Sequence, residues 1–153
     1  YLVPLSTQAM RIVKRLMQMN GRGARYLLVH RLEPQAMISE NTLNIAISRM
    51  GFKGRLTGHG IRATISTALN EVGFVEEWIE AQLSHADTNK IRAAYNHAEY
   101  VDQRRRMMQY WADLLDVLEG GGNLPIAEAY MAGGGRSSTV SENPTRTTSI
   151  FLI

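Results

Sequence analysis

The chain reads Thr57-Gly58-His59-Gly60-Ile61-Arg62-Ala63-Thr64 at the point where we expect a helix to begin. His59 and Arg62 stand three residues apart, so a helix presents their side chains on one face. The N-terminus of a helix adds free backbone N–H groups and the positive end of its dipole. The stretch therefore predicts a place for an anion, although a His-x-x-Arg pair on its own is more commonly structural.

Apolar spacing on both sides of this stretch predicts a chain built mostly of helices. Ser6 is placed to cap a helix that stops near Gly21, and Ser39 is placed to cap another that Gly51 ends. We expect four more helices and a short one near the C-terminus, at residues 61–72, 75–83, 87–94, 99–118 and 126–131, and Gly73 should end the first of them.

The apolar faces of these helices predict which residues form the core. The helix after Ser39 should bury Leu43, Ala46, Ile47 and Met50, and the helix over 99–118 should bury Met108, Trp111, Leu115 and Leu118. The apolar runs 1–5 and 26–30 predict short strands. The predicted fold class is mainly α (α+β), a helical domain with a small β element at its N-terminal edge.

The composition of the 153 residues is that of one ordinary globular domain, with 44% hydrophobic and 20% charged residues. The absence of cysteine excludes disulfides, cysteine-based zinc sites and thiol nucleophiles. No run approaches the roughly 18–20 apolar residues that a membrane span needs, and the N-terminus lacks the layout of a signal peptide. We therefore expect a soluble, cytoplasmic protein with no membrane partner.

The charge is distributed unevenly along the chain, although the net charge is only +3. Residues 1–62 carry ten Lys and Arg side chains against two acidic ones, a net charge of +8. Residues 63–119 have a net charge of −5, and residues 120–153 are balanced. Because a segment of this charge attracts phosphate backbones, the pattern predicts a nucleic-acid partner for the first half of the chain.

The last 34 residues differ in composition from those before them. Glycine runs at 120–122 and 133–135 stand among many Ser and Thr residues, which is the composition of a linker. We predict a domain over residues 1–119 and a tail over residues 120–153. The apolar end of the tail, residues 150–153, could dock on a neighbouring subunit, and a disordered or cloning-derived tail is an alternative of equal weight.

Two further motifs follow the first along the chain. Leu83-Ser84-His85-Ala86-Asp87 places a histidine just after a helix, and Ala93-Ala94-Tyr95-Asn96 places a tyrosine ten residues later. Alone, such a histidine is more commonly a turn residue, and such a tyrosine a core anchor. In this order and spacing, the three motifs resemble the catalytic boxes of the tyrosine recombinases, the phage integrase family. The satellite-phage and genomic-island integrases are the nearest type, and the similarity covers about residues 1–118.

The resemblance implies a catalytic domain of the tyrosine recombinase type and a role for each motif residue. Tyr95 attacks a DNA phosphodiester and forms a 3′-phosphotyrosyl link, which conserves the bond energy. Arg62 holds the phosphate oxygens with its planar guanidinium, and His59 and His85 hydrogen-bond the phosphate. His59 is also the better candidate to accept the tyrosine proton. The chemistry implied needs no ATP, no metal and no other cofactor.

Two other tyrosines are alternative nucleophiles under the same resemblance. Tyr100 and Tyr110 rank below Tyr95, because the family's tyrosine follows the second histidine by about ten residues. The implied partner is duplex DNA at an attachment site, bound by a homotetramer of the parent protein. The implied purpose is integration or excision of a mobile element, and the implied location is the bacterial cytoplasm, in association with the nucleoid, for a protein that a bacterium or a phage encodes.

The basic residues just before the first motif are the expected DNA-binding residues, namely Arg49, Lys53 and Arg55. The family also uses another arginine, from a Thr-Gly-x-Arg segment, and a hairpin lysine, both upstream of the part that this chain matches. Lys14 and Lys53 could substitute for that lysine, but each is more simply part of the basic surface. We therefore expect these 153 residues alone to be inactive, as the C-terminal part of a recombinase.

Three alternatives remain open from the sequence. A non-catalytic DNA-binding or decoy remnant of an integrase would keep the basic surface without the chemistry. A type IB topoisomerase shares the nucleophile and the phosphate-binding cations, although the flanking similarity favours an integrase. A plain helical domain without these activities is the residual alternative.

Overall fold

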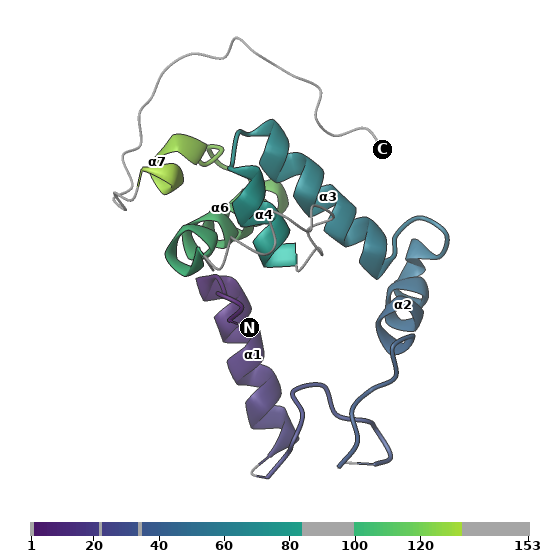
Figure 1. Cartoon of the computed structure of the whole chain (residues 1–153). Coiled ribbons are helices and arrows are strands. Elements are labelled where there is room, and N and C mark those ends of the chain that lie inside the picture. Colours follow the sequence, from purple (N-terminus) through teal and green to yellow (C-terminus); the bar gives the residue numbers. More distant parts are fainter. Residues whose placement is uncertain (1, 22, 34, 84–99, 133–153) are drawn as a thin grey trace, which may run out of the picture.

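The computed structural model describes residues 2–21, 23–33, 35–83 and 100–132, so the expected helix at 87–94 lies outside the described residues. In this part of the chain four helices pack together (Figure 1). They are α3 (Gly58–Glu71), α4 (Glu76–Leu83), α6 (Val101–Gly120) and α7 (Ala127–Met131). The described residues are mostly helical, which confirms the mainly α class.

The hydrophobic core lies between these four helices, and each of them contributes to it. Its buried residues are Leu69, Phe74, Ile79, Leu83, Met107, Tyr110, Leu114 and Ala127. Between α3 and α4 the chain turns at Gly73, whose φ of +90° suits glycine, and the N–H of Phe74 bonds to the carbonyl of Leu69 at 3.0 Å. This tight turn brings α4 back against α3, as the predicted stop at Gly73 requires.

The buried face of α6 is only partly the predicted one, because Met108 and Trp111 of the predicted stripe are half-buried and pack against the core. Met107, Tyr110 and Leu114 are buried, whereas Leu115 and Leu118 of the predicted stripe are 45% and 49% exposed. The two stripes are offset by one residue and both are apolar, so periodicity alone did not separate them. Packing against α3, α4 and α7 buries the stripe that contains Met107, Tyr110 and Leu114. The helix begins at Val101 and ends at Gly120, whereas the predicted helix spanned 99–118.

Helix α1 (Thr7–Asn20) extends away from the four-helix group (Figure 1). Its start is as predicted, because the Oγ of Ser6 accepts a hydrogen bond from the N–H of Ala9 at 3.1 Å. The contact with α6 is polar. The side chain of Gln109 accepts from the N–H of Thr7 at 2.8 Å, and the side chain of Gln8 donates to Asp113 at 2.8 Å. Helix α1 itself has no buried residue.

The helix expected after Ser39 is shorter and less buried than predicted. Helix α2 (Thr42–Ile47) is followed directly by the π-helical turn η1 (Ser48–Phe52), which contains Gly51 at a φ of +94°. Of the predicted buried face only Ile47 is buried, whereas Leu43 and Met50 are 53% and 66% exposed. Figure 1 shows the physical reason, since α2 lies at the far end of α3, away from the four-helix group.

The small β element at the N-terminal edge is not confirmed. Residues 2–5 form no strand, and the run 26–30 contributes only an isolated antiparallel bridge between Val29 and Met37. No neighbouring strand is present among the described residues to pair with these apolar runs, and an unpaired strand leaves its backbone N–H and C=O groups without partners.

The predicted short helix near the C-terminus is confirmed as α7, which packs on α6 with Ala127 buried. Gly121, whose φ is +77°, caps the C-terminus of α6, and the chain then runs from Gly121 to α7. The proposed boundary at residue 119 lies one residue before the end of α6, and the rest of the proposed tail beyond residue 132 lies outside the described residues. None of the described helices is long and apolar enough to cross a membrane.

Candidate active site

The N-terminus of α3 is held by two side chains that accept hydrogen bonds from its first backbone N–H groups. The Oγ1 of Thr57 accepts from the N–H of Gly60 at 3.0 Å, as an N-cap residue does. The Oδ1 of Asn44, in α2, accepts from the N–H of Gly58 at 2.9 Å. Two of the N–H groups expected to be free for an anion are therefore already bonded, which leaves anion binding mainly to the side chains of α3.

His59 and Arg62 both lie in the first two turns of α3, and both side chains are exposed. Arg62 donates a hydrogen bond from Nη2 to the backbone carbonyl of Leu83, the last residue of α4. A carbonyl in the last turn of a helix has no partner within the helix, so it is available to an arginine. This bond therefore joins Arg62 of the first motif to Leu83, the first residue of the second motif.

The two remaining motif residues, His85 and Tyr95, lie outside the described residues. The structure therefore relates Arg62 to the second motif only through Leu83. Their roles stay predictions that rest on the resemblance.

The alternative nucleophile Tyr110 is buried in the core, where only 4% of it is exposed. Its ring packs against those of Phe74 and Tyr130, with centroids 5.2 Å and 5.5 Å away. Burial, and then the negative charge of Glu128, raise the pKa of the Tyr110 hydroxyl. A tyrosine that DNA cannot reach and that resists deprotonation is unsuited to attack a phosphate. Tyr100, by contrast, precedes α6 with a left-handed φ of +46° and is half-buried.

An arginine that the sequence analysis did not single out occupies the centre of the fold. Arg104, in α6, is 0% exposed, and its Nε donates to the side-chain oxygen of Gln82 at 3.0 Å. Its Nη2 donates to the backbone carbonyl of Leu2 at 2.6 Å. The sequence gives no sign of this, because Arg104 stands in a run of three arginines that looks solvated. Its neighbour Arg105 indeed forms an exposed ion pair with Asp102 at 2.7 Å.

The predicted DNA-binding residues lie together ahead of α3. Arg49 is in η1, Lys53 follows η1 directly, and Arg55 lies in the turn that leads to Thr57. All three side chains are exposed. The arrangement puts three positive charges in the stretch that runs directly into the helix of His59 and Arg62.

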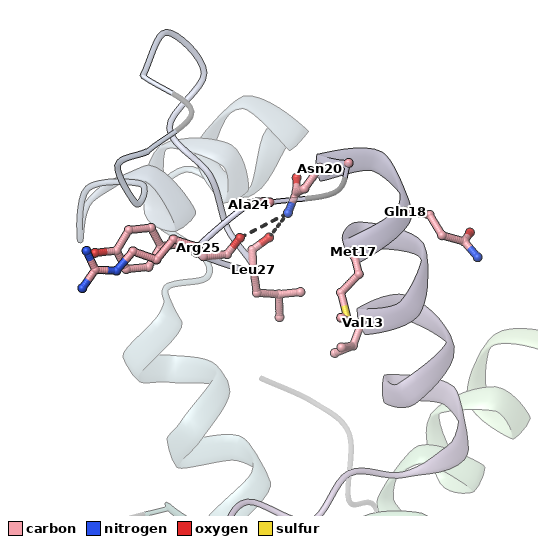
Figure 2. Close-up of a pocket in the computed structure, with 10 residues that line it drawn as sticks. Val13, Met17, Gln18, Asn20, Ala24, Arg25 and Leu27 are labelled. Carbon is pink, nitrogen blue, oxygen red and sulfur yellow. Dashed lines mark hydrogen bonds between the residues drawn. The ribbon is translucent and has the colours of Figure 1, made fainter.

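A separate pocket lies between the end of α1 and the segment that follows it (Figure 2). Its volume is about 780 Å³, and Val13, Met17 and Leu27 give it an apolar lining. Asn20 also lines it and donates to the carbonyl of Leu27 at 2.7 Å, and the guanidinium of Arg25 lies 5.6 Å from the ring centroid of Tyr26. The pocket contains none of the three motifs. The described residues also contain no cluster of three His, Asp or Glu side chains placed to hold a metal ion.

Known proteins are similar to this chain over most of its length. The family model of the phage integrase family matches residues 1–101. The prophage integrase IntA of Escherichia coli (strain K12) is 43% identical over 119 residues, which cover 78% of this chain and 29% of that protein. The integrase of Enterobacteria phage P4 is 43% identical over 121 residues, 76% of this chain and 27% of that protein.

A third relative, the integrase of Shigella phage Sf6, is 37% identical over 116 residues, 76% of this chain and 30% of that protein. The chain therefore spans less than a third of the length of the relatives that it matches. No solved structure matches it significantly.

Proposed function

The chain belongs to the phage integrase family, and we propose that it forms part of the catalytic domain of a tyrosine recombinase. Its function would be site-specific DNA recombination, the integration or excision of a mobile element. The observation that carries the proposal is the bond from Arg62 to the carbonyl of Leu83. It joins the first two catalytic motifs of the resemblance, although 21 residues separate the two positions.

The proposed reaction uses each motif residue in one step. The Oη of Tyr95 attacks the scissile phosphorus, the bond from phosphorus to the 5′ oxygen breaks, and a 3′-phosphotyrosyl link forms. The tyrosine proton passes to His59, and the departing 5′ oxygen takes up a proton to become a hydroxyl. Arg62 and His85 stabilise the negative charge that develops on the non-bridging oxygens. Attack by a second 5′-hydroxyl reverses the step on a new strand.

We further propose that residues 1–153 do not perform this reaction alone. The resemblance calls for a second arginine and for a lysine that protonates the leaving 5′ oxygen, and no motif of this chain matches either. The complete reaction would take place on duplex DNA at an attachment site, in a homotetramer of the parent protein. The exposed charges of Arg49, Lys53 and Arg55 support a DNA-facing role for the stretch before α3.

A chimera tests the proposal, in which residues 1–119 replace the matched segment of the integrase of Enterobacteria phage P4. The substrate is a nicked duplex carrying the recombination site of that integrase, so that cleavage traps a covalent protein–DNA adduct. We expect an adduct from the chimera, none from residues 1–153 alone, and none from the Tyr95→Phe chimera, which should bind the DNA nearly unchanged. The adduct is measured by its slower migration in denaturing gels.

The unaltered P4 integrase and the Tyr100→Phe chimera are the controls, and both should form the adduct. An adduct that persists in Tyr95→Phe and disappears in Tyr100→Phe would move the nucleophile to Tyr100. A folded chimera that binds the duplex but never forms an adduct would favour the non-catalytic remnant instead.

A further inference from the structure

Two arginines from different helices hold the last two residues of α4. The side-chain oxygen of Gln82 accepts from the Nε of Arg104, in α6, at 3.0 Å. The carbonyl of the next residue, Leu83, accepts from the Nη2 of Arg62, in α3. The end of α4 is thus bonded on one side to the buried arginine and on the other side to the candidate phosphate-binding arginine.

The guanidinium of Arg104 has little freedom to move, because its charge is fully buried. A guanidinium out of contact with water is tolerated only when hydrogen bonds satisfy its N–H groups, and its planar fork allows little change in their directions. Arg104 bonds to Gln82 and, at 2.6 Å, to the carbonyl of Leu2. It therefore connects α6, the end of α4 and the segment that leads into α1. Residues Met107 and Tyr110, on the same face of α6, anchor it in the core.

Arg62 has the opposite character, since its side chain is exposed and flexible by nature. Its guanidinium is oriented by the carbonyl of Leu83, and the described residues offer no second partner to it. The planar fork then keeps N–H groups for two phosphate oxygens. The direction of that fork depends on where the end of α4 places the Leu83 carbonyl.

We propose that Arg104 is a positioning residue for Arg62, acting through Gln82 and the Leu83 carbonyl at the end of α4. The inference rests on the proposed function, because it assumes that Arg62 binds the scissile phosphate. The packing of Leu83 in the core also holds the end of α4, and loss of the Gln82 bond removes the polar restraint beside it. The Leu83 carbonyl then orients the guanidinium of Arg62 less well, so Arg62 is correctly placed for the transition state less often. Binding of DNA as a whole changes little, since most of it comes from other phosphate contacts.

The first experiment uses the full 153-residue chain, with the Nε–H signal of Arg62 followed by NMR. Gln82→Met removes the acceptor at similar side-chain length, and Gln82→Glu keeps an acceptor for Arg104. Gln82→Met should shift or broaden the Arg62 signal, and Gln82→Glu should leave it close to that of the unaltered chain. Arg105→Met is the matched control on α6, because it removes a charge whose ion pair is exposed. An Arg62 signal that is equally unchanged in all three variants overturns the inference and leaves the proposed function untouched.

The second experiment measures adduct formation by the P4 chimera at saturating DNA, together with the DNA concentration for half-saturation. Arg62→Ala should lower the adduct rate by about 10²–10³-fold, the usual effect of removing one donor to a developing oxyanion. Gln82→Met should lower the rate by about tenfold without changing half-saturation, because it misdirects that same donor. Gln82→Glu should restore the rate. Arg104→Lys, which keeps the charge but loses the fork, should behave like Gln82→Met if it folds.

The double variant Arg62→Ala/Gln82→Met decides whether the effect passes through Arg62. If it does, the double variant is no slower than Arg62→Ala alone, because the positioned group is already gone. Rate losses that multiply would show that Gln82 and Arg104 act independently of Arg62, and would overturn the inference alone. An Arg62→Ala chimera with an undiminished rate would overturn the proposed function and this inference with it. Thermal unfolding of each variant by circular dichroism separates these outcomes from a loss of folding.

Discussion

At the scale of single residues, the carboxylate of Asp113, in α6, accepts hydrogen bonds from side chains of three helices. Asp113 accepts hydrogen bonds from Gln8 of α1 and from Gln109 of α6, each at 2.8 Å. Its second oxygen accepts from the hydroxyl of Tyr130, in α7, at 2.7 Å. Burial, together with this bond and the charge of Asp113, raises the pKa of Tyr130 to about 12. The hydroxyl therefore stays protonated as the donor that fastens α7 to α6.

Replacement of Tyr130 by Phe tests this bond. A hydrogen bond to a charged acceptor contributes about 1–2 kcal/mol at a partly exposed site, and we expect the free energy of unfolding to fall by about that amount. Because the folded-state pKa lies above the ordinary value of 10, the contribution is complete below pH 10 and is lost as the pH rises toward 12. Urea unfolding at several pH values measures it. A Tyr130→Phe chain that loses stability over pH 10–12 as steeply as the unaltered chain would contradict this account.

At the scale of helices, the choice between two apolar stripes of α6 decides the core. Met107 is fully buried, whereas Leu118, which the sequence pattern placed in the core, is 49% exposed. Met107→Ala should lower the free energy of unfolding by about 2–5 kcal/mol, as truncation of a buried side chain does. Leu118→Ala, the matched control on the same helix, should cost less than about 1 kcal/mol. Urea unfolding gives both values, and a larger cost for Leu118→Ala would restore the predicted stripe.

The same comparison explains which features of the fold and of the site could be predicted from the sequence. Caps and stops are local, and Ser6 and Gly73 were predicted correctly. The cap predicted at Ser39 was wrong, because α2 has Asn41 at its N-cap and no side-chain cap bond. The face that a helix buries depends on its neighbours, so the burial of Met107 in place of Leu118 could not be derived from spacing. The spacing of His59 and Arg62 was local as well, whereas the contacts of Arg62 with Leu83 and of Arg104 with Gln82 join residues more than twenty positions apart. The spacing of residues within one helix cannot predict contacts between residues that are so far apart in the sequence.

At the scale of the whole molecule, the positive charge lies in the N-terminal part of the chain, which has few buried residues. Within the described residues up to 56, only Pro4, Ser6 and Ile47 are buried. Helices α1 and α2 stand apart, and the segment between them runs from the end of one to the start of the other (Figure 1). The Lys and Arg side chains that the structure describes in residues 1–62 are all exposed, so most of the +8 charge of this segment faces solvent. Such a surface attracts phosphates through charge more than through fitted contacts.

Binding of the 153-residue chain to duplex DNA should accordingly be weak, insensitive to sequence and strongly dependent on salt. Each phosphate contact adds about −0.9 to the slope of log K against log salt concentration. The variant Lys53→Ala/Arg55→Ala should therefore have a slope shallower by about 1.8 if both side chains contact phosphates. Fluorescence anisotropy over a range of salt concentrations measures the slope.

The control is Arg105→Ala, which removes a charge from the half of the chain with net charge −5 and from a pair with Asp102. Its slope should equal that of the unaltered chain, because no DNA contact is lost. Equal slopes for all three proteins would move the DNA-binding surface away from the turn before α3. The duplex would then have to approach His59 and Arg62 without contacting the turn before α3.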